Sequence, residues 1–178
     1  MTTPPVTTPL EQRLKQNPDA IVSLHDVFSE LKELETLVRR AEFLMMFHDS
    51  NEHNRTLVQS YVECLYHPMI VLELPDEIPP YRANDNQYED YISLKLTKAF
   101  KRIPHFVKGH NDFIENSIKR ESVFIKTLEE LHKDEAELFA SLLRRKVDSK
   151  KYPGLTDELL IDTFKQYLPE GYVHDTKK

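Results

Sequence analysis

Residues 74–81 read Leu-Pro-Asp-Glu-Ile-Pro-Pro-Tyr, and this proline-rich stretch lies between an acidic and a basic part of the chain. Residues 1–94 contain 7 Lys and Arg against 16 Asp and Glu, a net charge of −9. Residues 95–151 contain 14 against 9, a net charge of +5, and residues 152–178 contain 3 against 5, a net charge of −2. Such a chain has one region that repels polyanions and another that attracts them. The pattern therefore informs about partners rather than about chemistry.

The composition favours a helical protein with a modest core. Only 3 of the 178 residues are glycine, fewer than most β proteins and phosphate-binding loops need. The single cysteine, Cys64, excludes an intramolecular disulfide and fits a reducing compartment. The Thr/Pro-rich N-terminus lacks the basic and apolar regions of a signal peptide, and no apolar run is long enough to span a bilayer. We therefore expect a soluble protein with no membrane partner.

Apolar periodicity predicts an all-α fold, an irregular bundle of about six helices in one domain. The first long helix, from residue 19 or 23, has apolar residues at steps of three and four over about seven turns. These residues are Ile21, Leu24, Phe28, Leu31, Leu34, Val38, Ala41 and Met45. A second helix at about 52–66 should pack back on the first as an antiparallel hairpin, because the connection is short. Further helices are expected at about 87–102, 112–132, from a capping-box-like start at Asp134 to about 147, and from Thr156 onward.

The expected organisation has a single helical domain at residues 19–171, between an arm and a tail. Residues 1–18 are predicted to form an extended Thr/Pro-rich arm with one short helix in its second half. The domain divides into an acidic helical hairpin at 19–67, a proline-rich extended connector at 68–86 and a helical part with a basic face at 87–171. Within the connector, residues 69–74 are apolar, and they predict one short extended segment without an obvious pairing mate. Residues 172–178 are the tail.

Three segments together resemble a known family. They are residues 74–82, residues 120–138 from Arg-Glu-Ser-Val-Phe-Ile to Asp-Glu-Ala-Glu-Leu, and Tyr-Pro-Gly-Leu-Thr at 152–156 followed by Leu-Pro-Glu at 168–170. In this order and spacing the chain resembles an uncharacterised family of small helical proteins from contractile-tailed phages, common in cyanophages and other relatives of the T-even phages. The resemblance covers roughly residues 38–171.

The resemblance implies a phage origin and a soluble helical fold. It also implies a place for the protein in the cytoplasm of the infected bacterium, or in the virion. A basic stretch often precedes Gly-Leu-Thr in this family, and it is represented here by Arg144-Arg145-Lys146 and Lys150-Lys151. The resemblance assigns no activity and no functional residue.

The residues that could form a zinc site are His48, His53, Cys64 and His67, and helical geometry opposes that site. Residues 53 and 64 would lie about 16 Å apart on one helix, at about 1.5 Å per residue. A zinc ion needs all its donors within about 2.3 Å. We therefore expect no metal ion here.

Other catalytic signatures are equally incomplete. Glu129 and His132 have the Glu-x-x-His spacing of di-iron carboxylate bundles, but these need two copies and the chain has one. His67 lies one turn from Cys64 and could lower the pKa of its thiol, yet no orienting group or oxyanion site accompanies the pair. The chain also has no nucleophile elbow, Walker loop or dinucleotide fingerprint. We expect no catalytic residue, no cofactor and no enzymatic activity.

The strongest candidate site is a basic stretch between residues 95 and 108, which has five positive charges and no acid. The residues expected to contact a partner are Lys95, Lys98, Lys101, Arg102, Phe106 and Lys108. The spacing places Lys95, Lys98 and Arg102 on one helix face. Cations interleaved with aromatic rings are typical of nucleic-acid grooves, but a net charge of −6 and a pI near 5.8 are not. The favoured interpretation is docking on an acidic protein or on the chain's own acidic part, with a solvated face and nucleic-acid contact as alternatives.

These observations lead to one expected function and one alternative. We expect a non-enzymatic protein–protein interaction component of a tailed phage, a virion-associated structural or adaptor protein. Its partners would be phage structural proteins or further copies of the chain itself. The alternative is an intracellular phage regulator that binds a host or phage polymerase or replication machine, with nucleic-acid contact through residues 95–108.

Overall fold

The apolar periodicity of the sequence corresponds to eight α-helices in the computed structural model, which describes residues 7–85 and 89–174. Within these ranges the helices are α1 (Pro9–Gln16), α2 (Leu24–Glu30), α3 (Leu37–Ser50), α4 (Glu52–Tyr66), α5 (Glu89–Phe100), α6 (Ser117–Glu130), α7 (Lys133–Ser141) and α8 (Asp157–Thr163). The 3-10 turns are η1 (Leu31–Glu33), η2 (Ile103–Phe106), η3 (Leu142–Arg144) and η4 (Lys165–Tyr167). The described residues form no β-sheet, so the predicted all-α class is confirmed, with more helices than expected.

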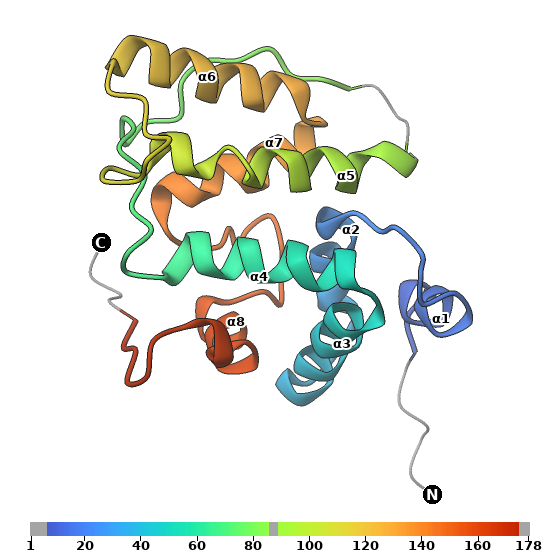
Figure 1. The fold of residues 1–178 in the computed structure, drawn as a ribbon. Coiled ribbons are helices and arrows are strands. Elements are labelled where there is room, and N and C mark those ends of the chain that lie inside the picture. The colour runs from blue at the N-terminus through green and yellow to red at the C-terminus, as the bar shows by residue number, and fades with distance from the viewer. Residues whose placement is uncertain (1–6, 86–88, 175–178) are drawn as a thin grey trace, which may run out of the picture.

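Helix α4 runs through the middle of the molecule, with α5, α6 and α7 on one side and α3 and α8 on the other (Figure 1). Its predicted bounds are confirmed. Leu57 and Leu65 are 0% exposed, and the large rings of Tyr61 and Tyr66 are 1% exposed. Each fully buried side chain of this size contributes about 1.5–3 kcal/mol, so α4 forms the centre of the core.

The predicted first long helix is wrong, because the chain breaks between α2 and α3. Leu34 is extended, with φ −99° and ψ 118°. Thr36 then begins α3, since its side chain accepts a hydrogen bond of 3.2 Å from the backbone N–H of Arg39. The Nε of Arg40 donates to the carbonyls of Leu31 and Leu34 at 3.1 and 2.9 Å, which satisfies acceptors that the break would otherwise leave unpaired.

The break also changes which residues enter the core. Ile21 and Val38 belong to the predicted apolar stripe, yet they are 38% and 66% exposed. Phe43, Leu44 and Phe47 are at most 1% exposed and form the buried face of α3 instead. A new helix start resets the helical phase, so a stripe drawn across the break identifies the wrong face.

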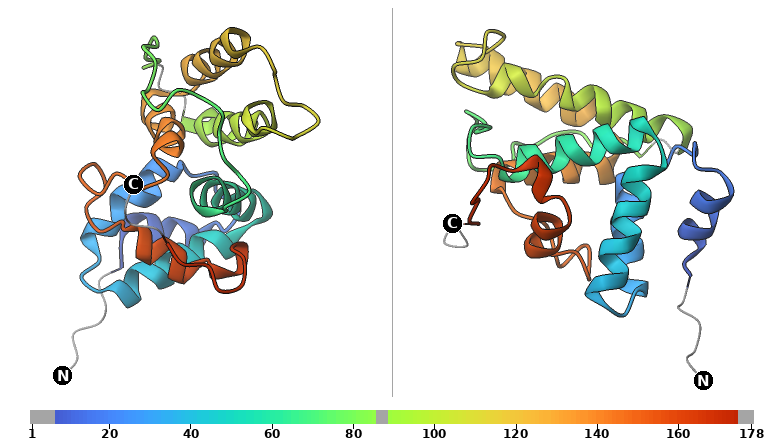
Figure 2. Two further views of the ribbon diagram at one scale, coloured as in Figure 1. Left: turned by 90° about the vertical axis from the view of Figure 1, so that its left-hand side faces the viewer. Right: turned by 60° about the horizontal axis from the view of Figure 1, so that its bottom comes forward.

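The predicted antiparallel hairpin of α3 and α4 is also wrong, because the two helices form a corner. Figure 2 shows α3 running across α4 rather than alongside it. Asn51 is both the last cap of α3 and the first cap of α4, with an extended backbone at φ −161° and ψ 169°. Its side chain accepts a hydrogen bond of 2.8 Å from the backbone N–H of Asn54. A single linking residue turns the chain but leaves no loop in which it could reverse.

The second half of the predicted N-terminal arm is part of the folded domain rather than an extended arm. Thr8 is 2% exposed and caps α1, and its hydroxyl donates to Glu30 at 2.8 Å. Leu14 is 2% exposed in the core. The predicted short helix is confirmed as α1, whereas residues 1–6 lie outside the described residues.

The predicted segment at 69–74 lies along the core without forming a sheet. Exposure alternates from residue to residue, as in an extended chain with one buried side. Leu72 and Val107 form an isolated antiparallel bridge, and the backbone N–H of Glu73 donates to the carbonyl of Phe106 at 2.7 Å. The segment therefore has a pairing partner at one point, which the sequence did not indicate.

Arg120 of α6 fixes this segment to the rest of the fold. The residue is 9% exposed, and its Nε donates to the carbonyl of Glu73 at 2.6 Å. Its Nη1 donates to the carbonyls of Ile114 and Glu115 at 2.7 and 3.1 Å, and the guanidinium lies 4.8 Å from the ring centroid of Phe113. One arginine thus satisfies three backbone acceptors that no helix or sheet provides for.

Helices α6 and α7 begin at residues other than the predicted ones. The helix expected at 112–132 starts only at Ser117, because the side chain of Asn116 caps it by accepting from the N–H of Lys119 at 2.9 Å. The predicted cap of α7 at Asp134 is wrong, since His132 is the capping residue.

The remaining predictions fall near the ends of the described ranges. Thr156 caps α8 as expected, accepting from the N–H of Leu159 at 3.1 Å. The helix expected at 87–102 corresponds to α5, and its first two predicted residues lie outside the described residues, as do residues 175–178 of the tail. Among the described residues, no helix combines the length and the apolar character that a membrane crossing requires.

Candidate functional site

The predicted basic surface lies on α5 and the chain that follows it. Lys95, Lys98 and Arg102 share one face, as the helical spacing predicts, and line a groove of about 290 Å³ beside α6. We call this the α5–α6 groove. It is lined by Asn84, Lys95, Lys98, Ala99, Arg102, Thr127, Glu130 and Leu131.

Arg102 links the two helices that border the groove. Its Nη1 donates to Thr127 Oγ1 at 2.9 Å, and its Nη2 pairs with Glu130 Oε2 at 2.7 Å. This two-pronged contact holds the guanidinium in a fixed orientation. The positive charge of Arg102 is therefore partly neutralised within the chain, and the groove owes most of its charge to its lysines.

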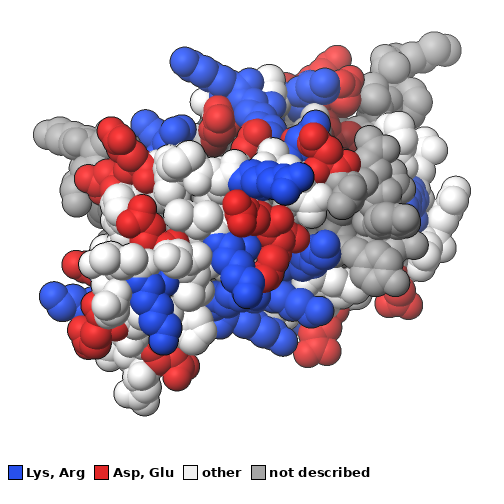
Figure 3. Space-filling model, turned by 90° about the horizontal axis from the view of Figure 1, so that it is seen from above, with Lys and Arg blue, Asp and Glu red and all other residues white. Residues whose placement is uncertain are grey.

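Four lysines of the predicted site have no ion-pair partner among the side chains that the structure describes, those of residues 7–85 and 94–174. They are Lys95, Lys98, Lys101 and Lys108, and all four are exposed. Figure 3 shows the face over α6, where Lys and Arg side chains are interspersed with Asp and Glu. The surface at this end of the molecule is therefore mixed in charge, and its basic character comes from a few local positions.

The prediction that Phe106 contacts a partner is wrong. The residue is 0% exposed and packs edge-to-face on Phe124, with ring centroids 5.5 Å apart. The short turn η2 directs this ring into the core while its neighbour Lys108 faces solvent. Cations interleaved with aromatic residues in the sequence are therefore not a surface of cations and rings in space.

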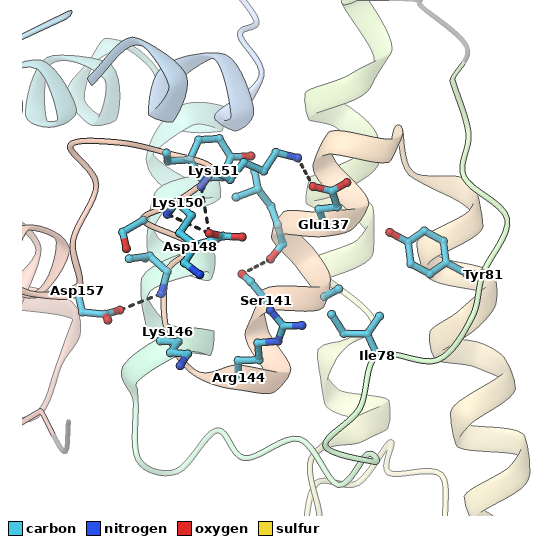
Figure 4. A pocket seen from close by; sticks show the side chains of 15 residues that line it. Ile78, Tyr81, Glu137, Ser141, Arg144, Lys146, Asp148, Lys150, Lys151 and Asp157 are labelled. Atoms are coloured by element: carbon cyan, nitrogen blue, oxygen red, sulfur yellow. Dashed lines mark hydrogen bonds and ion pairs between the residues drawn. The ribbon is translucent and has the colours of Figure 1, made fainter. Parts of the chain in front are cut away.

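A larger cleft, of about 580 Å³, lies where α7 ends. We call it the α7 pocket. It is lined by Ile78, Tyr81, Glu137, Leu138, Ala140, Ser141, Arg144, Lys146, Val147, Asp148, Ser149, Lys150, Lys151, Tyr152 and Asp157. Figure 4 shows Glu137, Ser141 and Arg144 between the loop at 146–152 and the connector residues Ile78 and Tyr81. The pocket thus joins three segments that are distant in the sequence.

Two of the acidic residues that line the α7 pocket accept hydrogen bonds from backbone N–H groups. Asp148 Oδ1 accepts from the N–H groups of Lys150 and Lys151 at 3.1 and 3.0 Å, which forms a local turn. Asp157 Oδ1 accepts from the N–H of Val147 at 3.0 Å and from the hydroxyl of Tyr66 at 2.5 Å. These carboxylates shape the loop rather than neutralise its cations.

Lys151 is held by two carboxylates of α7. Its Nζ lies 3.2 Å from Asp134 Oδ1 and also pairs with Glu137. Burial alone would lower the pKa of Lys151, but the hydrogen bonds and charges of Glu137 and Asp134 outweigh burial and raise it. Lys151 therefore stays protonated and fixes the loop to α7.

Three cations of the pocket remain without a side-chain partner in the described part of the chain. They are Arg144, Lys146 and Lys150, and all three are exposed. Arg144 and Lys146 also line an adjoining cleft of about 360 Å³ on the side of Tyr172. The lining has four cations, Lys151 included, against three carboxylates, and this excess of one positive charge makes the α7 pocket attractive to anions.

Arg145 points away from these cations, because its backbone is left-handed with φ 49°. Its Nη2 donates to the carbonyl of His67 at 3.0 Å, and its Nη1 donates to the carbonyl of Ile70. This reversal ends η3 and explains why α7 does not continue to residue 147 as predicted. Neighbouring arginines in the sequence thus have different roles, one structural and one facing solvent.

A buried polar cluster adjoins the α7 pocket at Tyr152, which belongs to both. Glu135 is 0% exposed, and its Oε1 accepts hydrogen bonds from the Ser23 hydroxyl and from the N–H of His25 at 3.3 Å. Burial raises the pKa of Glu135 to about 7, although these two hydrogen bonds oppose the shift. Nδ1 of His25 lies 2.8 Å from the hydroxyl of Tyr152, whose pKa burial also raises. The cluster joins α2, α7 and the loop before α8.

The cysteine and histidine residues considered for metal binding or catalysis are separated. Cys64 is 5% exposed, and burial, together with the charge of Glu63, raises the pKa of its thiol to about 12. The thiol is therefore protonated at neutral pH, and the suggested activation by His67 is wrong. His48 lies between Asp49 at 2.7 Å and the hydroxyl of Tyr167 at 2.5 Å. No three His, Cys, Asp or Glu side chains converge on a metal position anywhere in the described ranges.

The α7 pocket was not predicted from the sequence. The basic stretch at 144–151 was expected only as a feature of the resembling family. The available signal was five cations in eight residues, interrupted by Val147, Asp148 and Ser149. The sequence could not show which of these cations bind partners within the chain. Arg145 and Lys151 do so, and the other three do not in the described residues.

Comparison with curated proteins and with solved structures gives no significant match. Residues 33–149 match a family of unknown function, DUF6433. The match includes α3 to α7, η3, the whole α5–α6 groove and most of the residues that line the α7 pocket. It covers well over half of the 178 residues, and the chain belongs to the family of unknown function DUF6433.

Proposed function

We propose that this protein is a non-enzymatic interaction component of a tailed phage, which docks an acidic protein surface on the α5–α6 groove and its adjacent lysines. The observation that carries the proposal is the set of exposed lysines, Lys95, Lys98, Lys101 and Lys108, which have no ion-pair partner in the described residues. Opposite charges across an interface steer encounter and suppress wrong partners. Arg102 supports such docking because it already fixes the orientation of α5 against α6.

The acidic character of the rest of the chain explains why the partner should be a protein. The whole chain has a net charge of −6, so a nucleic acid would be repelled by most of its surface. An acidic protein needs to approach only the groove. The acidic part of a second copy, residues 1–94, is a partner of the same chemistry and would give self-assembly.

The phage origin rests on the resemblance of residues 74–82, 120–138 and 152–156 to proteins of contractile-tailed phages. Within such a phage we favour a structural or adaptor role in the virion, made in the host cytoplasm. Mass spectrometry of purified particles tests this role directly. The chain should be present at a fixed copy number, and its absence from particles would contradict a virion role.

A charge-reversal experiment tests the surface itself. The groove variant Lys95→Glu, Lys98→Glu, Lys101→Glu should lose its partner during purification from infected cells. The control variant Arg13→Glu, Lys119→Glu, Lys165→Glu changes three exposed cations that have no ion pair in the described residues, and by the same net charge. Retention of the partner by the groove variant, or equal loss in both variants, would reject the assignment.

A further inference from the structure

The α7 pocket has the size of a small-molecule site. Its volume of about 580 Å³ falls within the range of about 300–1,000 Å³ that is typical of ligand pockets. It shares no lining residue with the α5–α6 groove. Whatever occupies the pocket is therefore independent of the docking function proposed above.

The charges of the pocket favour an anion. Arg144, Lys146 and Lys150 line it and have no ion-pair partner in the described residues. The carboxylates that also line it are engaged: Glu137 with Lys151, Asp148 with the backbone of its own loop, and Asp157 with Val147 and Tyr66. An arriving anion would thus compete with no internal partner for these three cations.

The geometry of the cations favours a phosphate over a simple carboxylate. Arg144 lies at the end of η3, and Lys146 and Lys150 belong to the loop that follows it (Figure 4). Three donors around one pocket suit a group with several acceptor oxygens. Arginine recognises phosphate through its planar fork and lysine through its point charge.

The opposite wall of the cleft is apolar and aromatic. Ile78 and Tyr81 are half-buried and extend from the connector toward the pocket (Figure 4). Burial and the nearby charge of Glu137 raise the pKa of Tyr81, so its hydroxyl is protonated and available as a hydrogen-bond donor. A half-buried aromatic ring beside a phosphate site suits a planar base, because nucleobases stack on aromatic side chains.

We propose that the α7 pocket binds a nucleotide, with its phosphates on Arg144, Lys146 and Lys150 and its base against Tyr81 and Ile78. The shared chemistry is a phosphate attached to a nucleobase through a sugar. That group is available as a free nucleotide or as the 5′-phosphorylated end of a nucleic-acid strand.

Calorimetric titration of the full chain with ADP at low salt tests the proposal. ADP should bind saturably, pyrophosphate more weakly and adenosine weakest. The variant Arg144→Gln, Lys150→Gln should weaken the affinity for ADP by about tenfold or more, since the phosphates lose two charge-assisted hydrogen bonds. Tyr81→Leu should weaken ADP and leave pyrophosphate unchanged. The control Arg13→Gln, Lys165→Gln removes two exposed cations elsewhere and should bind ADP like the wild type.

Two results would overturn the proposal. One is the absence of ADP binding at millimolar concentration in low salt. The other is equal weakening in the pocket and control variants, which would indicate general charge attraction. Competition by an oligonucleotide only when its 5′ end is phosphorylated would identify a strand end as the source, whereas competition by neither form would identify the free nucleotide. Since the groove lysines are unchanged in every variant, failure here would leave the docking proposal untouched.

Discussion

The guanidinium of Arg145 donates a hydrogen bond of 3.0 Å to the carbonyl of His67, and so fixes the end of η3 to the end of α4. A second bond from the same group reaches the carbonyl of Ile70. The proline-rich connector is thereby held at its first residues by Arg145 and further along by Arg120. Two arginine side chains thus donate to backbone carbonyls that a neighbouring β-strand would pair in a sheet.

At residue 145 we expect a glycine variant to be more stable than an alanine variant, which is the reverse of the usual order. Arg145→Ala should destabilise the fold by about 2–3 kcal/mol, because two backbone acceptors lose a charged donor. Arg145→Gly loses the same bonds but removes the left-handed strain at φ 49°, and should be more stable than the alanine variant by about 1 kcal/mol. Urea unfolding measures both. Equal stability of the two variants would show that strain at this position is negligible.

A pH-dependent prediction follows from Glu135. Burial raises its pKa to about 7 from 4.5, so the folded chain holds a proton that the unfolded chain has released. The stability linked to this group is complete below pH 4.5 and declines as pH rises through about 7, by about 3 kcal/mol in all. Glu135→Gln cannot ionise, so its stability relative to wild type should increase between pH 5 and about 8.

Two features of the same region define the control for this measurement. Burial lowers the pKa of the neighbouring His25, so that residue makes stability rise with pH near neutrality and partly masks Glu135 in the wild-type curve. The difference between variant and wild type isolates the carboxyl. Glu158→Gln, an exposed change at the first turn of α8, should show no comparable slope. Parallel curves for Glu135→Gln and wild type would contradict the account.

The start of α3 depends on one hydroxyl. Thr36→Ala should destabilise the fold by about 1 kcal/mol, since the N–H of Arg39 loses its capping acceptor. Thr36→Ser should retain most of the stability because it keeps the oxygen. Thermal unfolding of the two variants distinguishes them, and a fully stable alanine variant would mean that Arg40 alone maintains the break.

The docking surface should be dispensable for folding. Lys95, Lys98 and Lys101 are exposed and make no ion pair in the described residues, so each reversal to Glu should change stability by about 0.5 kcal/mol, or up to about 1 kcal/mol for Lys98 in the last turn of α5. Arg102→Ala should cost more, since it leaves Glu130 and Thr127 without their donor. If the triple variant unfolds, its loss of partner binding would have no bearing on the surface.

Helix type and approximate place could be predicted from periodicity, as α4 and α8 show. The break before Thr36 could not, because it depends on Arg40 reaching the carbonyls of Leu31 and Leu34 across the turn. The face shared by Lys95 and Lys98 followed from helical spacing alone. The burial of Phe106 did not, because tertiary packing on Phe124 decides it. Local spacing was therefore sufficient within a helix and insufficient where contacts between distant residues set a break or bury a side chain.

The α7 pocket could not be predicted from the sequence for a related reason. Which cations face solvent depends on the left-handed backbone at Arg145 and on the distant carboxylates that pair with Lys151. The pairing of Lys151 with Asp134 spans 17 positions, and that of Arg145 with Ile70 spans 75. A run of basic residues shows how many cations are present, but it does not show which of them are paired within the folded chain.

Zero-length crosslinking of the chain in its native assembly tests the central claim most directly, because it joins amines only to carboxylates in direct contact. The account predicts crosslinks from Lys95, Lys98 and Lys101 to Asp and Glu residues clustered on one partner surface. Crosslinks should be few from Lys165, which is equally exposed but far from the groove in the sequence. Intermolecular crosslinks that avoid the three groove lysines would contradict docking by opposite charge.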